Sequence, residues 1–167
     1  MGYIQELRKL VGTRPIILTG ASVIVFNERN EILLQQRSDT GDWGVIGGSI
    51  ELGESFEEAA ARELYEEAGL TAQDLTFKCM LSGSDMYYKY PHGDEIYNVT
   101  AVFETRDYMG VPTILDDEGL DLQFFDVQTA PPPLNPMAVQ ILTKAKYIAA
   151  DSHDPHDPRD LSPNAHD

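Results

Sequence analysis

The stretch Gly47–Leu70 reads GGSIELGESFEEAAARELYEEAGL and joins a glycine-containing loop to a long glutamate-rich segment. Ser55 stands directly before the segment and Glu58 follows three residues later, which is the pattern of a capping box at a helix start. Residues 56–68 contain no glycine or proline, and Gly69 is a natural helix stop. The sequence therefore predicts a loop that ends at Ser55 and a helix over residues 56–68.

Three glutamates fall on one side of this predicted helix. At about 100° per residue, Glu63, Glu66 and Glu67 lie within an arc of roughly 100°. Carboxylates so close together repel one another, and a divalent cation such as Mg²⁺ or Mn²⁺ removes that conflict. The simpler alternative is a solvated acidic face on a surface helix. The neighbouring apolar stripe, which should face the core, consists of Ala60, Ala61, Leu64 and Ala68.

Arg62 precedes the first of these glutamates and has two interpretations. It is either an exposed surface charge, or it holds Glu54 or another nearby carboxylate through a charge-assisted hydrogen bond. We favour the second interpretation, because the acidic residues around it offer several partners.

The whole pattern resembles the signature of the Nudix hydrolases at every fixed position. Five residues separate Gly48 from Glu54, seven separate Glu54 from Arg62, and Arg62–Leu70 follows without a gap. The resemblance implies an α/β fold in which a mixed β-sheet is sandwiched between helices, an α/β/α sandwich. It differs in one place: Ile46 stands where family members often carry a proline, before the two glycines.

The resemblance also implies the roles of the residues in the signature. Arg62 should orient the cluster, and Glu54 should lie outside the ligand set. The groups implied to bind the metal, Mg²⁺ or its substitute Mn²⁺, are the carboxylates of Glu63, Glu66 and Glu67 and the backbone carbonyl of Gly48.

The activity implied by the resemblance is hydrolysis of the pyrophosphate bond in a nucleoside diphosphate linked to another moiety. That substrate is an ADP-ribose-like compound, a nucleotide sugar, a dinucleoside polyphosphate or a modified nucleoside triphosphate. The alternative is a nucleotide-binding sensor of the same fold that binds without turnover. The intact glutamates favour the enzyme, since a binding module has less need for all of them.

The reaction needs a general base, and the sequence contains more than one candidate. Glu63 is available within the signature itself. Glu118, in the acidic run 116–118 before a predicted strand, is the second candidate, although an ordinary surface turn explains that run equally well. Asp94 and Glu95 also follow the signature.

Aromatic residues are the candidates for substrate binding. Within residues 85–98, Tyr87, Tyr88 and Tyr90 offer flat faces for a base and phenols for ribose or phosphate. Ordinary aromatic packing in a hairpin is the alternative for this segment. Trp43 is a further candidate for stacking on a base, but a tryptophan at a strand start is more often part of a core.

The remaining segments predict strands and two further helices. A short amphipathic helix is expected over residues 3–11, and a last helix should run from Asn135 as cap to about Ala150. A hairpin is expected from a buried strand over 16–26, a turn at 27–30 and a strand over 31–36. Other extended segments are expected over 43–46, 49–51, 75–82, 95–104 and 120–127.

Composition limits the domain organisation and the partners. The 167-residue chain, with 42% hydrophobic residues, fits one domain over residues 1–150, followed by an acidic, His/Asp/Pro-rich tail over 151–167 that is expected to be flexible. The net charge of −16 argues against a nucleic-acid polymer as partner, whereas a small nucleotide remains compatible if metal ions supply positive charge locally.

The sequence also leads to expectations about location and assembly. Cys79 is the single cysteine, and there is no signal peptide or membrane-spanning run. We therefore expect a cytoplasmic protein that does not interact with a membrane. A homodimer is considered only by analogy with the family.

Overall fold

The computed structural model describes residues 2–150, so the predicted tail over 151–167 lies outside the described residues. The central sheet is built around two long strands, β1 (Ile16–Val25) and β8 (Glu95–Thr105), which run parallel. β4 (Ile46–Ser49) pairs antiparallel with β1, while β6 (Thr76–Leu81) and β7 (Tyr87–Lys89) pair antiparallel with β8. The sheet is therefore mixed, as expected.

A second sheet contains β2 (Ile32–Arg37) between β10 (Gly119–Phe125) and β3 (Trp43–Gly44). The predicted hairpin over residues 16–36 is therefore wrong, because its two strands belong to different sheets and do not pair along their length. A single bridge, Phe26 to Ile32, joins the ends of β1 and β2. β1 already has β4 and β8 on its two edges, so no edge is left for β2.

Short elements complete the fold. β5 (Thr71–Ala72) pairs with β9 (Tyr108–Met109), and η1 (Ser84–Met86) is a 3₁₀ turn before β7. The extended segment expected over 49–51 is displaced toward the amino terminus, because the ladder with β1 covers residues 46–49.

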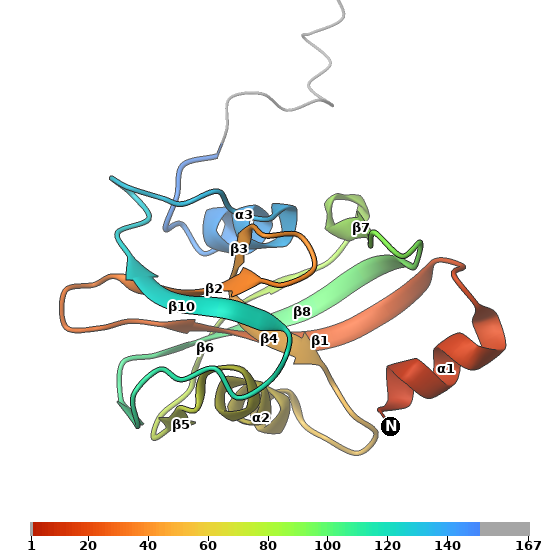
Figure 1. Cartoon of the computed structure of the whole chain (residues 1–167), viewed down its shortest axis with the longest axis horizontal. Coiled ribbons are helices and arrows are strands. Elements are labelled where there is room, and N and C mark those ends of the chain that lie inside the picture. Colours follow the sequence, from red (N-terminus) through yellow and green to blue (C-terminus); the bar gives the residue numbers. More distant parts are fainter. Residues whose placement is uncertain (1, 151–167) are drawn as a thin grey trace, which may run out of the picture.

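Helices α2 (Phe56–Ala68) and α3 (Pro136–Lys144) cover opposite faces of the sheet (Figure 1). Because successive strand residues point to opposite faces, Val23 and Val25 pack with α2, whereas Ile24 and Phe26 pack with α3. This arrangement is the predicted α/β/α sandwich. The two cores position the loop of the Nudix signature, residues 47–55 (the signature loop), at the edge of the sheet that β4 forms.

α2 begins and ends where the sequence predicted. The Ser55 side chain accepts from the Glu58 N–H, the Glu58 side chain accepts from the Ser55 N–H, and Gly69 adopts the left-handed conformation. The predicted apolar stripe is wrong in one residue: Ala59 is fully buried, whereas Ala61 is only half-buried. The completely buried side of α2 therefore includes Ala59, Ala60, Leu64 and Ala68.

α3 is shorter than the predicted helix to Ala150. It ends at Lys144, and Lys146 adopts a left-handed conformation with φ 66°. The turn brings Tyr147 against Phe26, with ring centroids 5.1 Å apart, and its hydroxyl donates to Glu104. Packing of this aromatic ring on the sheet therefore accompanies the early end of the helix.

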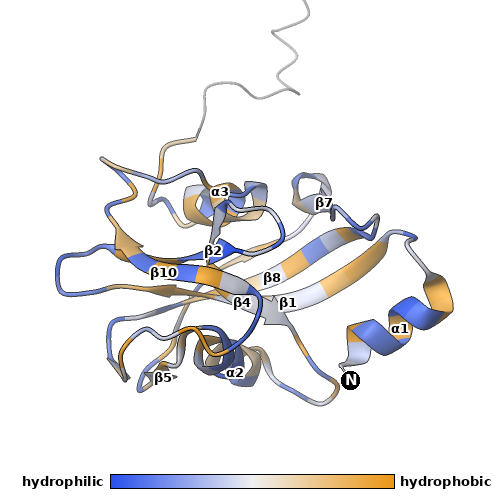
Figure 2. Cartoon of the chain, viewed as in Figure 1, coloured by the Kyte–Doolittle hydropathy of each residue, from blue (hydrophilic) through white to orange (hydrophobic). Residues whose placement is uncertain are grey.

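Helix α1 (Tyr3–Val11) stands apart from both cores, and none of its residues is buried. Figure 2 shows hydrophobic residues at intervals along this mainly hydrophilic helix. Among residues 2–150, no helix is long and apolar enough to cross a membrane.

Candidate active site

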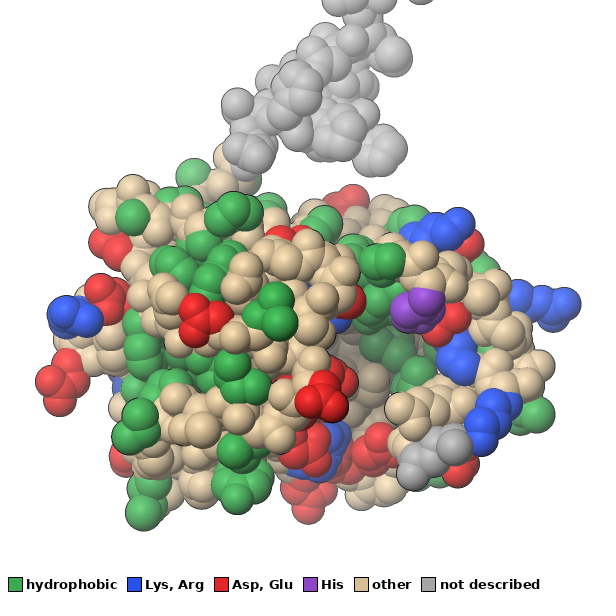
Figure 3. All heavy atoms as spheres, viewed as in Figure 1, with side chains coloured by type: hydrophobic (Ala, Val, Ile, Leu, Met, Phe, Trp, Pro, Cys, Tyr) green, Lys and Arg blue, Asp and Glu red, His purple; other side chains and the backbone are tan. Residues whose placement is uncertain are grey.

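A cleft of about 710 Å³ opens beside the signature loop, within the size range of small-molecule sites. Figure 3 shows this hollow, with acidic side chains gathered along one margin. Its lining includes residues of the signature (Gly47, Gly48, Ser49, Arg62, Glu63, Glu66), the loop 116–118, the aromatic segment (Tyr88, Tyr90, His92) and the face of the sheet beneath α3 (Ser22, Asn98, Thr100).

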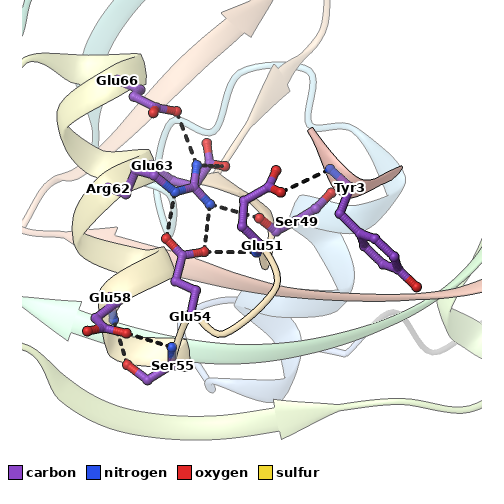
Figure 4. A network of polar contacts seen from close by, with 9 residues as sticks. All are labelled: Tyr3, Ser49, Glu51, Glu54, Ser55, Glu58, Arg62, Glu63 and Glu66. Atoms are coloured by element: carbon purple, nitrogen blue, oxygen red, sulfur yellow. Dashed lines mark hydrogen bonds and ion pairs between the residues drawn. The ribbon is translucent and has the colours of Figure 1, made fainter. Parts of the chain in front are cut away.

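Glu63, Glu66 and Glu118 form the acidic margin of the cleft. Arg62 lies beside Glu63 and Glu66 and donates five hydrogen bonds (Figure 4). Its Nε and Nη2 bind the two oxygens of Glu54, at 2.7 and 3.0 Å. Nη1 binds Glu63 at 2.8 Å and Glu66 at 3.1 Å, and Nη2 also binds the Ser49 carbonyl at 2.9 Å. A guanidinium has five N–H groups, so Arg62 keeps none for a ligand.

The three glutamates of α2 differ in exposure because they lie at different angles around the helix. The Glu66 side chain is 52% exposed, that of Glu63 is 13% exposed, and Glu67 is 4% exposed. Glu67 accepts a hydrogen bond from the Gly47 N–H at 3.0 Å. Gly48 contacts Glu63 so closely that a Cβ on Gly48 would stand 2.4 Å from Glu63 Oε1.

Burial shifts the pKa values of Glu63 and Glu67. Burial, followed by the charge of Glu63, raises the pKa of Glu67 well above its ordinary value. Burial also raises the pKa of Glu63, although the hydrogen bond from Arg62 opposes this. In contrast, the hydrogen bond from Arg62 lowers the pKa of Glu54. The effect of Arg62 on the pKa therefore outweighs that of burial at Glu54 but not at Glu63.

Glu118 reaches the same cleft from the loop before β10, although it lies far from α2 in the sequence. Burial, followed by the charge of Asp116, raises its pKa, and the negative charge of Glu66 acts in the same direction. The loop is held in place because the Ser38 N–H donates to the Glu118 carbonyl at 2.9 Å. Glu63, Glu66 and Glu118 therefore line the same cleft.

The donor set fits a hard divalent cation. It consists of carboxylate oxygens, which suit Mg²⁺ or Mn²⁺, and burial is the main cause of the raised pKa of Glu63, Glu67 and Glu118. Within residues 2–150, no three His, Cys, Asp or Glu side chains are already gathered closely enough to hold a metal ion. Instead, Glu63 and Glu66 each give one oxygen to Arg62.

The predicted substrate-binding aromatics separate into two groups. Tyr88 and Tyr90 line the cleft, with their ring centroids 4.9 Å apart. Tyr87 is absent from the lining; its hydroxyl donates to Glu95 and its ring packs against Tyr97. Trp43 is buried in the core against Phe125, at 4.8 Å between ring centroids.

Residues that sequence reasoning missed also line the cleft. Arg37, at the end of β2, forms two hydrogen bonds with Asp39, from Nε at 2.9 Å and from Nη2 at 2.8 Å. Within residues 2–150, Arg37 makes no other side-chain hydrogen bond, so its Nη1 remains available to a ligand. His92 stacks on Tyr90 with an interplanar angle of 6°. His92 lies within the aromatic segment 85–98, whereas only the tertiary structure identifies Arg37 as a residue of the cleft.

Two curated proteins are similar to this chain over part of its length. A putative 8-oxo-dGTP diphosphatase from Bacillus subtilis is 53% identical over 53 residues, covering 32% of this chain and 36% of the relative. An ADP-ribose pyrophosphatase from Methanocaldococcus jannaschii is 30% identical over 110 residues, covering 64% of this chain and 61% of the relative. The match therefore spans less than two thirds of the length of either curated relative.

A solved structure extends the likeness to the fold. The crystal structure of a MutT NUDIX hydrolase from Burkholderia pseudomallei has a TM-score of 0.64 and 25% identity, covering 78% of this chain and 98% of that one. The expected Nudix fold is thereby confirmed. A family model described as the NUDIX domain matches residues 17–145, well over half of the chain, and the protein therefore belongs to the NUDIX family.

Proposed function

We propose that this protein is a divalent-cation-dependent hydrolase that cleaves the pyrophosphate bond of a nucleotide-type substrate. The observation that carries the proposal is that Glu63, Glu66 and Glu118 line one cleft of about 710 Å³, and that Arg62 binds two of them, Glu63 and Glu66. A phosphate-bearing substrate would meet only repulsion at such an acidic margin without a cation. Membership of the family supports the same chemistry.

The residues that would hold the cation are Glu63, Glu66 and Glu67, with the carbonyl of Gly48. A divalent cation held there supplies charge neutralisation of the diphosphate and activation of a water molecule. Arg62 acts behind this set: its hydrogen bonds fix one oxygen of Glu63 and one of Glu66, so the remaining oxygens are oriented in advance.

Two carboxylates are placed to take the proton from the attacking water. Glu63 is held by Arg62, so its pKa is pulled in opposite directions by burial and by that hydrogen bond. Glu118 has no hydrogen bond from a cationic side chain among residues 2–150, and its pKa is raised by burial first. A raised pKa suits a base that works near neutral pH, so we favour Glu118, with Glu63 as the alternative.

Other residues of the cleft lining supply binding groups for the rest of the substrate. Tyr88 and Tyr90 offer aromatic surface for a base. Arg37 has donors free for a phosphate, which Arg62 lacks, so we assign substrate phosphate contacts to Arg37. The activities named for the two curated relatives suggest oxidised nucleoside triphosphates and ADP-ribose as the first substrates to examine.

The test is product analysis of the purified protein with Mg²⁺ against ADP-ribose, nucleotide sugars, dinucleoside polyphosphates and ordinary and oxidised nucleoside triphosphates. Cleavage of one class would establish hydrolysis and identify the second moiety from its products. Tight binding of one class without cleavage of any would favour the sensor instead.

A variant pair connects the activity to the acidic margin. Glu66→Gln should lower turnover by about two orders of magnitude or more while the circular dichroism spectrum is unchanged. Glu57→Gln is the matched control, because Glu57 is an exposed glutamate of the same helix outside the cleft. An unchanged rate for Glu66→Gln would refute the assignment of the metal site.

A further inference from the structure

The amino-terminal helix α1 forms one wall of the cleft, although it belongs to neither core. Gly2, Ile4 and Gln5 line the cleft together with the signature loop. In Figure 1 the helix runs beside the body of the molecule, with its amino-terminal end next to the loop between β4 and α2. A ligand that fills the cleft would therefore contact the start of this helix.

The start of α1 is capped by a residue from that loop. Gly2, the residue at the cap position, has no side chain to accept a hydrogen bond from the first turn. Instead, the Tyr3 N–H donates to Glu51 Oε2 at 2.9 Å (Figure 4). A carboxylate at this place accepts a hydrogen bond from a free N–H, and its negative charge interacts favourably with the positive end of the helix dipole.

The other end of α1 is held by Arg8. Its guanidinium donates to the carbonyls of Gly12, Arg14 and Glu95, and its Nε lies 3.3 Å from Asp94 Oδ2. These contacts tie the end of the helix to the start of β8. They do not hold the beginning of the helix, which would be free to move if the hydrogen bond between Tyr3 and Glu51 broke.

Little apolar packing holds α1 between these two ends. No residue of the helix is buried, and Leu10 is 85% exposed. A segment with few buried contacts opens at low free energy compared with the core. The polar contact with Glu51 therefore carries an unusual share of the attachment of the helix.

Glu51 is also connected to the acidic margin, through Glu54 and Arg62. The Glu51 N–H donates to Glu54 Oε2 at 3.0 Å, and Glu54 binds Arg62 through both oxygens. We propose that Glu51 is a latch: α1 closes over the bound substrate when the Glu51 carboxylate caps Tyr3, and opens for exchange when this bond breaks. The role in substrate exchange rests on the proposed hydrolase function; the capping of α1 does not.

The first experiment measures amide hydrogen exchange in the full-length protein without substrate. Glu51→Ala should speed exchange in peptides covering residues 3–11 by about five-fold, the effect of losing a helix cap. Peptides from α2 should be unchanged. Glu51→Gln keeps an acceptor oxygen and should restore most of the protection, while the exposed Glu57→Gln serves as the control. Unchanged exchange in Glu51→Ala would overturn the latch.

The second experiment measures steady-state kinetics with whichever substrate the wild type cleaves. Glu51→Ala should raise KM by about three-fold or more with kcat within about two-fold, because binding is weakened while the reacting groups remain in place. Arg8→Gln, which releases the other end of the helix, should give the same pattern. Faster exchange with an unchanged KM would overturn the role of α1 in substrate binding.

The failure of the proposed hydrolase function and the failure of the Glu51 proposal can be distinguished by these two experiments. If the wild type cleaves no substrate, the proposed hydrolase function fails, and hydrogen exchange still decides whether Glu51 holds α1. If the wild type is active and Glu51→Ala lowers kcat with no change in KM, Glu51 acts on the acidic margin instead, which also contradicts the latch.

Discussion

Arg62 and Glu54 form a two-pronged ion pair, with Nε to Oε1 at 2.7 Å and Nη2 to Oε2 at 3.0 Å. The two parallel bonds fix the plane of the guanidinium, so the remaining donors point at Glu63, Glu66 and the Ser49 carbonyl. Glu54 is therefore connected to Glu63 and Glu66 through Arg62, and it is not one of the residues that line the cleft.

Arg62→Lys should lower kcat/KM by about ten-fold to a hundred-fold. An ammonium group has three donors around one nitrogen and cannot bridge Glu54, Glu63 and the Ser49 carbonyl at once. Titration of activity with Mg²⁺ checks the prediction, which requires a weaker apparent affinity for the cation. Wild-type kinetics in this variant would show that the planar arrangement is dispensable.

Gly48→Ala should disturb the acidic margin without unfolding the protein. A Cβ at this position would stand 2.4 Å from Glu63 Oε1, so the Glu63 carboxylate must move. We expect kcat to fall by about a hundred-fold, because a displacement of about an ångström at a reacting group has an effect of this size. Ser49→Ala is the control, since Ser49 bonds to Arg62 through its backbone carbonyl; equal kinetics for both variants would contradict the argument.

Glu67 should make the metal-free protein less stable as the pH rises. Because burial and Glu63 raise its pKa well above 4.5, the folded state retains a proton that the unfolded chain has already lost. The resulting stabilisation is complete below the unfolded pKa and is lost as the pH rises through the folded pKa. Urea denaturation with a chelator present should therefore show a smaller loss of stability with increasing pH in Glu67→Gln than in the wild type.

Added Mg²⁺ should reduce the same pH dependence in the wild type, because a bound cation stabilises the ionised carboxylate. Glu67→Gln should respond less to the cation. Parallel stability curves for the two proteins, with and without Mg²⁺, would mean that Glu67 does not titrate in this range.

Leu64→Ala should lower the free energy of unfolding by about 2 to 5 kcal/mol, the usual effect of emptying a buried leucine site. Leu64 is completely buried in the core between α2 and the sheet. Leu52→Ala is matched in chemistry but lies at a position that is 78% exposed, and it should change stability by about 0.5 kcal/mol or less. Similar losses in both variants would contradict the assigned core face.

The limits of the signature helix were predictable because their causes are local. Ser55, Glu58 and Gly69 act on backbone groups within four residues, so their identities alone predict where the helix begins and ends. The orientation of the helix was less predictable. Ala59 is buried in place of Ala61, since the packing of the sheet selects which part of the broad alanine surface faces inward.

The sequence by itself determined the capped helix, the order of the main strands and the acidic pattern, because these depend on neighbours along the chain. Only the tertiary structure decided that β1 pairs with β8 and not β2, and that Arg37, Glu118 and α1 share one cleft with Arg62. Those contacts join residues far apart in the chain. They depend on which strand edges remain free and on packing across two cores, which no local pattern encodes.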